Sequence, residues 1–407
     1  MTPIPRPLPA MLSGLRVLDF TWAWAGPYAT TLLGFAGAEV VKVESRTRLD
    51  LTRRSTGHSG TGDQVSPSFS HINLNKRSIT LNLSDPRAVA LARDLVRVFD
   101  VVAENYRPGV MDKLGLGYEE LRAIKPDLIM ISSSTRGAKG PERRYAGYAT
   151  IFASLSGLSH VTGYVGGPPT QFRNSMDLCS AHTMAIATLA AVYAWRRSGR
   201  GQHVDVSASE AAIALLGDTV LGAIMGGQSP ARQGNADPVM APHNCYPCRG
   251  EDSWISIAVG SEAEWHALRH AMGDPSWSHE ERFAAAGGRQ RHREEMDRLI
   301  GGWTAAWDRV ELAETLQRVG VAATPVMSSE DLYGDPHLGT RRKFVHGADH
   351  EREDVTVVGP PWRHSATPAQ VERLGVALGQ DNAHIFGEVL GLSGQEIERL
   401  QAERVLH

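Results

Sequence analysis

Short apolar runs that alternate with helical segments are the feature that most constrains the fold of this chain. Residues 15–20 predict a strand, and a helix is expected from Pro27 to about Phe35. Gly37 ends that helix, and residues 39–44 predict a second strand. Strands joined by a helical crossover run parallel, because the helix returns the chain to the end of the sheet from which it started. The chain therefore opens with a β-α-β unit.

The same alternation continues through the first half of the chain. Further strands are predicted at 79–83, 101–105, 127–132 and 203–206. Strands that alternate with helices predict a doubly wound α/β sheet. Ligands of such sheets bind at the carboxyl ends of the strands. The side chains expected at those ends are Trp22, Trp24, Glu44, Asn105, Tyr106 and the run 133–136.

The length and a change of composition predict two domains. A chain of 407 residues is too long for one core. Residues 226–242 are rich in Gly, Pro, Ser and Asn, and a strand at 254–259 with amphipathic helices follows them. We predict a large domain formed by residues 1–225 and 326–407, and a small α+β domain over 226–325. A late strand is expected at 355–358 and a final helix after Ser393.

Composition excludes several classes of partner. The formal charge is −3, with 42% hydrophobic and 21% charged residues, which describes an ordinary globular protein without the basic excess of a nucleic-acid binder. The first eleven residues lack the apolar segment of a signal peptide, and no apolar run is expected to span a bilayer. Three cysteines fit a reducing compartment. We predict a cytoplasmic protein without nucleic-acid or membrane partners.

One carboxylate, Asp177, stands between a turn-rich run and a long apolar helix. The run starts at Gly166, and the helix is expected from Leu178 to about Arg197, buried on all sides because it is apolar on all sides. Free N–H groups and the helix dipole stabilise an anion at such a helix start. Asp177 is either an N-cap, for which aspartate is favoured, or a catalytic carboxylate. A second apolar helix after Ser207 is likewise expected to be buried.

Motifs for other chemistries are missing or incomplete. The first strand–helix turn lacks G-x-G-x-x-G, which disfavours NAD binding. Walker A, H-E-x-x-H and G-x-S-x-G are absent as well. Cys245 and Cys248 lie near His243, but no second Cys pair completes a zinc site, so no metal is predicted. Cations on predicted loops either face solvent or hold a phosphorylated ligand: Arg46, Lys76, Arg77, Arg107, Lys113 and Lys139.

Several motifs in order give the chain a family resemblance. They are LSGLRVLD at 12–19, AGPY at 25–28, GAEVVKVE at 37–44, NKRS at 75–78, ENYRPG at 104–109, LGLGY at 114–118, GGPP at 166–169 and SGRGQ at 198–202. The chain resembles the class III CoA-transferases, the family of formyl-CoA transferase and carnitine CoA-transferase. The resemblance runs from Leu12 to the final helix.

The resemblance implies a fold, an assembly and a set of site residues. The large domain would be Rossmann-like and built from both chain ends, and two chains would interlock like linked rings. Asp177 matches the family nucleophile. CoA would lie against Trp24, Ala25, Arg46, Leu81, Asn105, Tyr106 and Lys113, with Tyr148 near the reacting end. Arg46 is one residue beyond the matching basic position, which is Ser45 here. CoA thioester would be a substrate, and no metal or redox cofactor is implied.

The implied reaction moves CoA from an acyl-CoA to a carboxylic acid. A carboxylate attacks the thioester to give a mixed anhydride, and CoA thiolate converts this to an aspartyl-CoA thioester. The glycine run of formyl-CoA transferase is replaced by residues 234–238, which disfavours formate and oxalate. The run 242–245 is similar to family members that use succinyl-CoA and larger dicarboxylates such as benzylsuccinate.

Two alternatives are kept. The first is a 2-methylacyl-CoA racemase of the same superfamily, but the Gly-His-Asp context of its base is replaced by Gly147-Tyr148-Ala149. The second is a non-catalytic CoA-binding subunit of a hetero-oligomer, against which the presence of Asp177 argues. A homodimer is expected, with a heteromer of paralogous subunits as the alternative.

Overall fold

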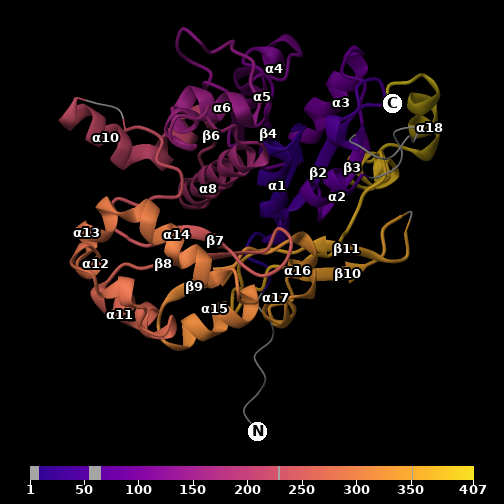
Figure 1. Ribbon diagram of the computed structural model, residues 1–407. Helices are drawn as coiled ribbons and strands as arrows, with labels where there is room; N and C mark the ends of the chain where they lie inside the picture. Colours follow the sequence, from indigo (N-terminus) through magenta and orange to yellow (C-terminus); the bar gives the residue numbers. More distant parts are fainter. Residues whose placement is uncertain (1–8, 55–65, 228–229, 351) are drawn as a thin grey trace. The chain divides into compact units, whose positions relative to one another are not determined.

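The chain divides into two compact units. The computed structural model describes residues 9–54, 66–227, 230–350 and 352–407 (Figure 1). The large unit comprises the described residues of 1–159, 171–227 and 337–407, and the small unit those of 160–170 and 228–336. The Gly-Gly-Pro-Pro turn at 166–169 thus belongs to the small unit, which the sequence did not indicate, whereas Asp177 belongs to the large unit.

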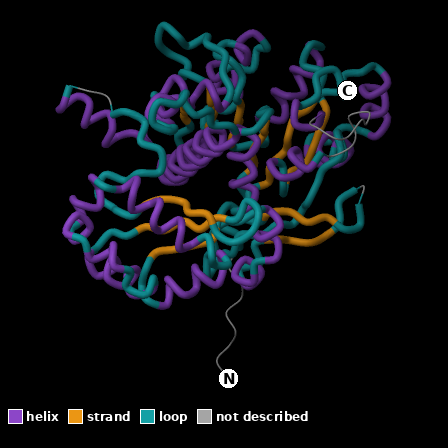
Figure 2. The backbone as a smooth tube through the Cα atoms, in the orientation of Figure 1, coloured by secondary structure: helices purple, strands orange, loops and turns teal. Residues whose placement is uncertain are grey.

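A six-stranded parallel sheet forms the centre of the large unit, which confirms the predicted α/β class (Figure 2). Its strands are β1 (Arg16–Asp19), β2 (Glu39–Glu44), β3 (Lys76–Thr80), β4 (Val101–Glu104), β5 (Ile129–Ser134) and β6 (Gln202–Ser207). The spatial order is β3-β2-β1-β4-β5-β6. The direction of winding reverses between β1 and β4, and the crevice at such a reversal is where α/β sheets bind ligands. Trp22 follows β1 there, and Asn105 follows β4.

Both faces of β1, β2, β4 and β5 are buried because these strands are largely apolar at successive positions. Leu18, Val41 and Val102 pack with α3 (Pro86–Val96), α5 (Tyr118–Ile124) and the final helix α18 (Gly394–Ala402). Their neighbours Val17, Val40 and Val101 pack with α1 (Ala25–Phe35) and α8 (Asn174–Ser198). Adjacent residues of a strand point to opposite faces, so each strand contributes to two cores.

The remaining elements of the large unit are short. They are η1 (Leu51–Arg54), α2 (Pro67–Ile72), α4 (Val110–Lys113), α6 (Ala149–Ser156), α9 (Ala208–Ile213), η2 (Ala214–Leu216), α10 (Gly217–Gly226), β10 (Phe344–Gly347), β11 (Val355–Val358) and η4 (Ala383–Val389). The boundaries between the two units fall within α7 (Leu158–Val161) and α17 (Pro336–Thr340). The strand predicted at 355–358 is present, and it pairs antiparallel with β10 in a separate sheet. The predicted strand at 79–83 is wrong in its position, since β3 ends at Thr80.

The small unit packs helices on an antiparallel sheet of three strands. The sheet order is β7 (His243–Pro247), β8 (Trp254–Ala258), β9 (Ala322–Pro325). Its helices are α11 (Glu262–Ala271), η3 (Ser276–His279), α12 (Glu281–Ala284), α13 (Ala286–Arg291), α14 (Arg293–Thr304), α15 (Arg309–Arg318) and α16 (Ser329–Gly334). Trp265, Ile300 and Leu316 are fully buried between sheet and helices. This core is separate from those of the large unit.

Two apolar helical stretches are less buried than the sequence predicts. In α8 one face packs on the sheet, but Ile186 is 67% exposed and Tyr193 is 63% exposed. No residue of α10 is buried, and Met225 is 86% exposed. The expectation that both helices are buried is therefore wrong. By length and composition alone, Asn174–Ser198 and Ala208–Gly226 could also cross a membrane. The expectation that no apolar run could span a bilayer is therefore corrected. Core helices of globular enzymes pass the same test.

Candidate active site

A cavity of about 550 Å³ opens at the carboxyl ends of the strands of the large unit. Its wall combines the turn after β1, the turn after β4, the end of β5 and the start of α6. Six of the residues predicted from the sequence line it: Trp24, Ala25, Asn105, Tyr106, Tyr148 and Asp177. Residues more than 150 positions apart in the sequence thus meet around one space, at the place where the winding of the sheet reverses.

Asp177 enters this cavity from the first turn of α8. The N-cap is Arg173 and Asp177 is the fourth residue of the helix, so the N-cap interpretation of Asp177 is wrong. The side chain is half-buried, and burial raises the pKa of its carboxyl from 3.8 to about 6. In the described part of the chain, no hydrogen bond or ion pair engages this carboxylate. At neutral pH it is therefore ionised, poorly solvated and uncommitted, as a nucleophile should be.

Hydrogen bonds from Asn105 and Asp50 hold the turn Trp22–Ala23–Trp24, which forms one wall of the cavity. The Asn105 side chain accepts from Trp22 N and donates to Trp22 O, both at 2.9 Å. Ala23 has a φ of 64°, a left-handed conformation that costs a residue with a Cβ about 1–2 kcal/mol. Asp50 holds this strained residue by accepting from Ala23 N at 3.2 Å. Asn105, predicted as a CoA contact, is thus also the clamp of the turn.

Four buried charges lie beneath that turn. Lys76 Nζ contacts Asp19 Oδ2 at 2.9 Å, and Lys42 Nζ lies 3.3 Å from Asp50 Oδ2. Lys42 also donates to Thr21 O at 2.6 Å, which ties the pair to the turn. Burial alone would raise the pKa of Asp19, but the two lysines and two threonine hydroxyls bring it below its usual range. Lys76 is fully buried, so the expectation that it lies on a loop as a surface or ligand cation is wrong.

A smaller cavity of about 220 Å³ adjoins the first and shares Trp22, Arg48, Tyr106 and Val110 with it. Leu81, predicted to contact CoA, lines this second space. The Arg48 guanidinium lies over the Trp22 ring, 4.6 Å from its centroid. Arg48 was missed by sequence reasoning. The signal that could have found it is its position, three residues beyond the basic position that Ser45 occupies.

Two predicted cations lie outside these walls. Arg46 and Lys113 are both exposed, and neither is among the residues that line the two cavities. Arg107, which the sequence placed on the loop after β4, does line the larger cavity. Arg48 and Arg107 are therefore the guanidinium groups that the structure brings to this site.

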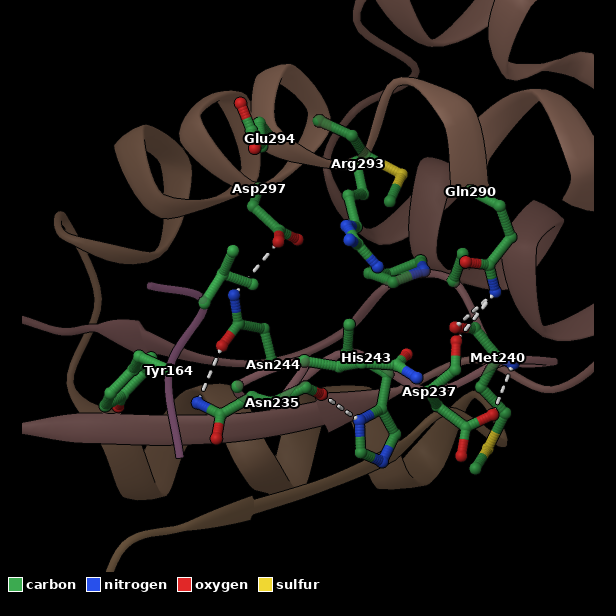
Figure 3. A pocket seen from close by; sticks show the side chains of 17 residues that line it. Tyr164, Asn235, Asp237, Met240, His243, Asn244, Gln290, Arg293, Glu294 and Asp297 are labelled. Carbon is green, nitrogen blue, oxygen red and sulfur yellow. Dashed lines mark hydrogen bonds between the residues drawn. The ribbon is translucent and has the colours of Figure 1, made fainter. Parts of the chain in front are cut away.

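The small unit has a cavity of its own, of about 310 Å³ (Figure 3). Its wall is formed by the segment with Tyr164, by residues 233–244 and by the start of α14. It includes the residues that stand in place of the glycine run of formyl-CoA transferase. Within the described residues, no group of three or more His, Cys, Asp or Glu side chains is placed to hold a metal ion. Cys245 is exposed and Cys248 is buried, both as free thiols.

Comparison with known proteins decides the family. The model of "CoA-transferase family III" matches residues 12–382. The chain belongs to CoA-transferase family III. Succinyl-CoA--D-citramalate CoA-transferase of Chloroflexus aurantiacus is 36% identical over 99% of this chain and 98% of its own. Succinate--glutarate CoA-transferase of Agrobacterium fabrum is 34% identical over 96% and 98%.

The solved structures agree with the family assignment. A CAIB/BAIF family protein from Brucella suis superposes with a TM-score of 0.86 at 30% identity, over 94% of this chain and all of that one. Rv3272 of Mycobacterium tuberculosis gives a TM-score of 0.78 at 26% identity. The protein is an enzyme, a class III CoA-transferase, as its resemblance implied.

Proposed function

We propose that this class III CoA-transferase moves CoA from succinyl-CoA to a small dicarboxylic or hydroxy-dicarboxylic acid, with Asp177 as the nucleophile. The observation that carries the proposal is the half-buried, uncommitted carboxylate of Asp177 in the larger cavity. The relatives support the substrate class, since their names pair succinyl-CoA or succinate with D-citramalate, glutarate or mesaconate.

The proposed reaction proceeds by two anhydrides and one thioester. An Asp177 oxygen attacks the thioester carbonyl of succinyl-CoA, the C–S bond breaks, and CoA leaves as thiolate from a mixed anhydride. The thiolate then attacks the Asp177 carbonyl carbon, which releases succinate and leaves an aspartyl-CoA thioester. The acceptor carboxylate attacks that thioester and expels the thiolate again. Attack of the thiolate on the acceptor carbonyl forms the new acyl-CoA and restores Asp177.

The site supports this chemistry electrostatically. Each attack develops an oxyanion, which the backbone N–H groups in the first turn of α8 would stabilise. The raised pKa of Asp177 reflects an anion deprived of water, which is a stronger nucleophile than a fully solvated carboxylate. CoA supplies the thiolate, so we propose no metal or redox cofactor.

CoA would occupy the two adjoining cavities of the large unit. The strand order 3-2-1-4-5-6 is that of Rossmann sheets, which bind nucleotide ligands at the reversal point. Trp24, Ala25, Asn105 and Tyr106 would line the path toward Asp177, and Leu81 the path away from it. Arg48 and Arg107 would pair with phosphate groups, as guanidinium groups do elsewhere. The Gly-rich turn of dinucleotide enzymes is missing, so NAD is not proposed.

We propose a homodimer of interlocked chains in the cytoplasm. The support is the apolar surface of α8 and α10, where Ile186, Ile224 and Met225 are each more than 60% exposed. Exposed apolar patches of this kind mark interfaces. A heteromer is the alternative, because the relative Succinyl-CoA--L-malate CoA-transferase of Chloroflexus aurantiacus has alpha and beta subunits. Equilibrium sedimentation of the pure chain separates the two.

Trapping of the acylated enzyme tests the function. The enzyme is incubated with succinyl-CoA and then hydroxylamine, and peptides are mapped by mass spectrometry. A hydroxamate is expected on Asp177, and Asp177→Ala should lose it while CoA binding is retained. Asp94→Asn, on the exposed side of α3, is the matched control and should label as the wild type does. Full transfer activity in Asp177→Ala would refute the proposal.

A further inference from the structure

The wall of the small-unit cavity carries an uncommitted guanidinium. Arg293 is the first residue of α14, is half-buried, and directs its side chain into the cavity in Figure 3. In the part of the chain that the structure describes, no hydrogen bond or ion pair engages this guanidinium. An arginine stays charged at any working pH, so the cavity contains a permanent cation with its five donors available.

Asp297 lies four residues after Arg293 on α14, and its carboxylate already accepts hydrogen bonds. Tyr246 Oη donates to Asp297 Oδ1 at 2.5 Å, and Asn244 Nδ2 donates to Asp297 Oδ2 at 2.9 Å. Tyr246 is only 2% exposed and therefore fixed in the core. Asn235 Nδ2 continues the network by donating to Asn244 Oδ1 at 2.9 Å. These bonds hold one wall rigid and direct the Asp297 charge away from an ion pair with Arg293.

Hydrogen bonds also hold the wall of the cavity that Asp237 and Met240 form. Gln290 Nε2 donates to the carbonyls of Asp237 and Met240, both at 3.0 Å. Asp237 accepts from two backbone N–H groups, which hold the pKa of its carboxyl below the usual range. His243 Nδ1 lies 2.6 Å from Asn235 O and donates to this carbonyl. Glu294 also lines the cavity and is exposed, so water solvates its carboxylate.

We propose that this cavity binds a small carboxylate and that Arg293 recognises it. A guanidinium forms two parallel hydrogen bonds with one carboxylate, and because hydrogen bonds already hold the walls, binding costs little conformational entropy. A volume of about 310 Å³ has room for an acid of four to six carbons. The inference rests on the proposed function for the identity of the ligand, which is the dicarboxylic acid substrate of CoA transfer.

Direct binding tests this assignment without reliance on turnover. The full-length protein is titrated calorimetrically with succinate in the absence of CoA. Arg293→Gln should weaken binding by about 10- to 100-fold, as expected for a lost charged hydrogen bond in a partly buried site. Arg293→Lys should fall between the two, because it keeps the charge and loses the planar fork. Arg298→Gln, on the same helix with a side chain that is 72% exposed, is the matched control and should bind as the wild type does.

Three results would overturn the assignment. One is wild-type affinity for succinate in Arg293→Gln, another is loss of binding in Arg298→Gln to the same extent, and the third is a wild-type protein that binds no succinate. The fold is not at risk, because no described hydrogen bond depends on the Arg293 guanidinium. Asp177→Ala separates this failure from failure of the proposed function: it should still bind succinate although transfer is lost.

Discussion

Each of the two cavities of this molecule holds a charged side chain that no described hydrogen bond or ion pair engages, a carboxylate in one and a guanidinium in the other. In the large unit, Asn105 and Asp50 hold the turn beside Asp177, and the Asp177 carboxylate is left without a partner among the described residues. In the small unit, Asn244 and Gln290 hold the walls, and the Arg293 guanidinium is left in the same condition. Polar groups in partly buried walls are normally satisfied, so the exceptions mark the groups that await a ligand.

The difference between the two groups lies in what each can do. Asp177 is the nucleophile in the proposed function, and burial shifts the pKa of its carboxyl toward neutrality. An arginine neither titrates nor attacks in this range, so Arg293 can only recognise and orient. We therefore assign covalent chemistry to the large unit and recognition of the free acid to the small unit.

The largest expected effect separates these two roles. Asp177→Ala should lower the rate of CoA release from succinyl-CoA by about 10⁴-fold or more, as loss of a nucleophile does. Arg293→Gln should lower the maximal rate of that half-reaction by less than about 10-fold, because the nucleophile is intact. Single-turnover release of CoA, followed with a thiol reagent, measures both. Equal losses in the two variants would contradict the division of roles.

The next effect concerns the stability of the two units. Lys76→Met removes the partner of the fully buried Asp19, and a broken buried pair costs about 3–5 kcal/mol. In the small unit, Arg289→Met removes a buried cation whose partner Glu262 has a side chain that is 49% exposed and can turn to water, so a smaller loss is expected. Urea unfolding followed by circular dichroism measures both free energies. A larger loss for Arg289→Met would show that the small-unit ion pair is the more critical one.

A third prediction uses the shifted pKa of Asp177. The folded carboxyl titrates at about 6 rather than 3.8, so ionised Asp177 destabilises the fold above pH 6, and this cost vanishes below about pH 4. Asp177→Asn should therefore raise the free energy of unfolding by about 1–3 kcal/mol at pH 7.5 and by nearly nothing at pH 4. Urea unfolding at the two pH values measures the difference. Arg293→Gln is the control, and a pH-independent gain in Asp177→Asn would refute the link to ionisation.

The smallest expected effect is that of the clamp. Asn105→Ala frees both polar groups of Trp22, so kcat/KM for succinyl-CoA should fall by about 5- to 30-fold, with most of the change in KM. Asn105→Asp keeps the acceptor for Trp22 N and should lose less. Asn235→Ala removes a comparable hydrogen bond of a side-chain amide in the small unit. It should leave KM for succinyl-CoA within about twofold of the wild-type value. A KM unchanged in Asn105→Ala would show that the turn is held without the clamp.

Much of the fold followed from sequence patterns with a local cause. The second strand was predicted with the bounds that β2 has, because apolar runs of that length between Gly37 and polar loops leave few alternatives. The late strand at 355–358 and the cap at Ser393 were predicted for similar reasons. The carboxyl ends of β1 and β4 were expected to carry the site, and Trp22, Asn105 and Tyr106 meet there.

The errors have causes that are not local. Lys76 was expected on a surface loop because its burial depends on Asp19, which lies 57 residues away. The helices α8 and α10 were expected to be buried inside the chain because they are apolar. Apolar composition shows that a helix surface needs to be covered, but it does not show whether the same chain or another protein covers it. Arg48 reaches the site only because the turn before η1 places its guanidinium over Trp22. The role of Arg293 depends on Tyr246 and Asn244 occupying Asp297, a three-residue arrangement with no signature in the sequence.

The path of the chain through the small unit restricts how this enzyme can be rebuilt. Residues 160–170 belong to that unit, yet residues 171–227 return to the large unit before 228–336 complete it. The hydrogen bond between Gly234 N and Gly163 O joins the two pieces. If 228–336 were exchanged for the corresponding part of a relative, the new segment would have to pack against residues 160–170 of the original chain. A graft that alters acid specificity has to carry both pieces, or else leave the scaffold in place and change single side chains.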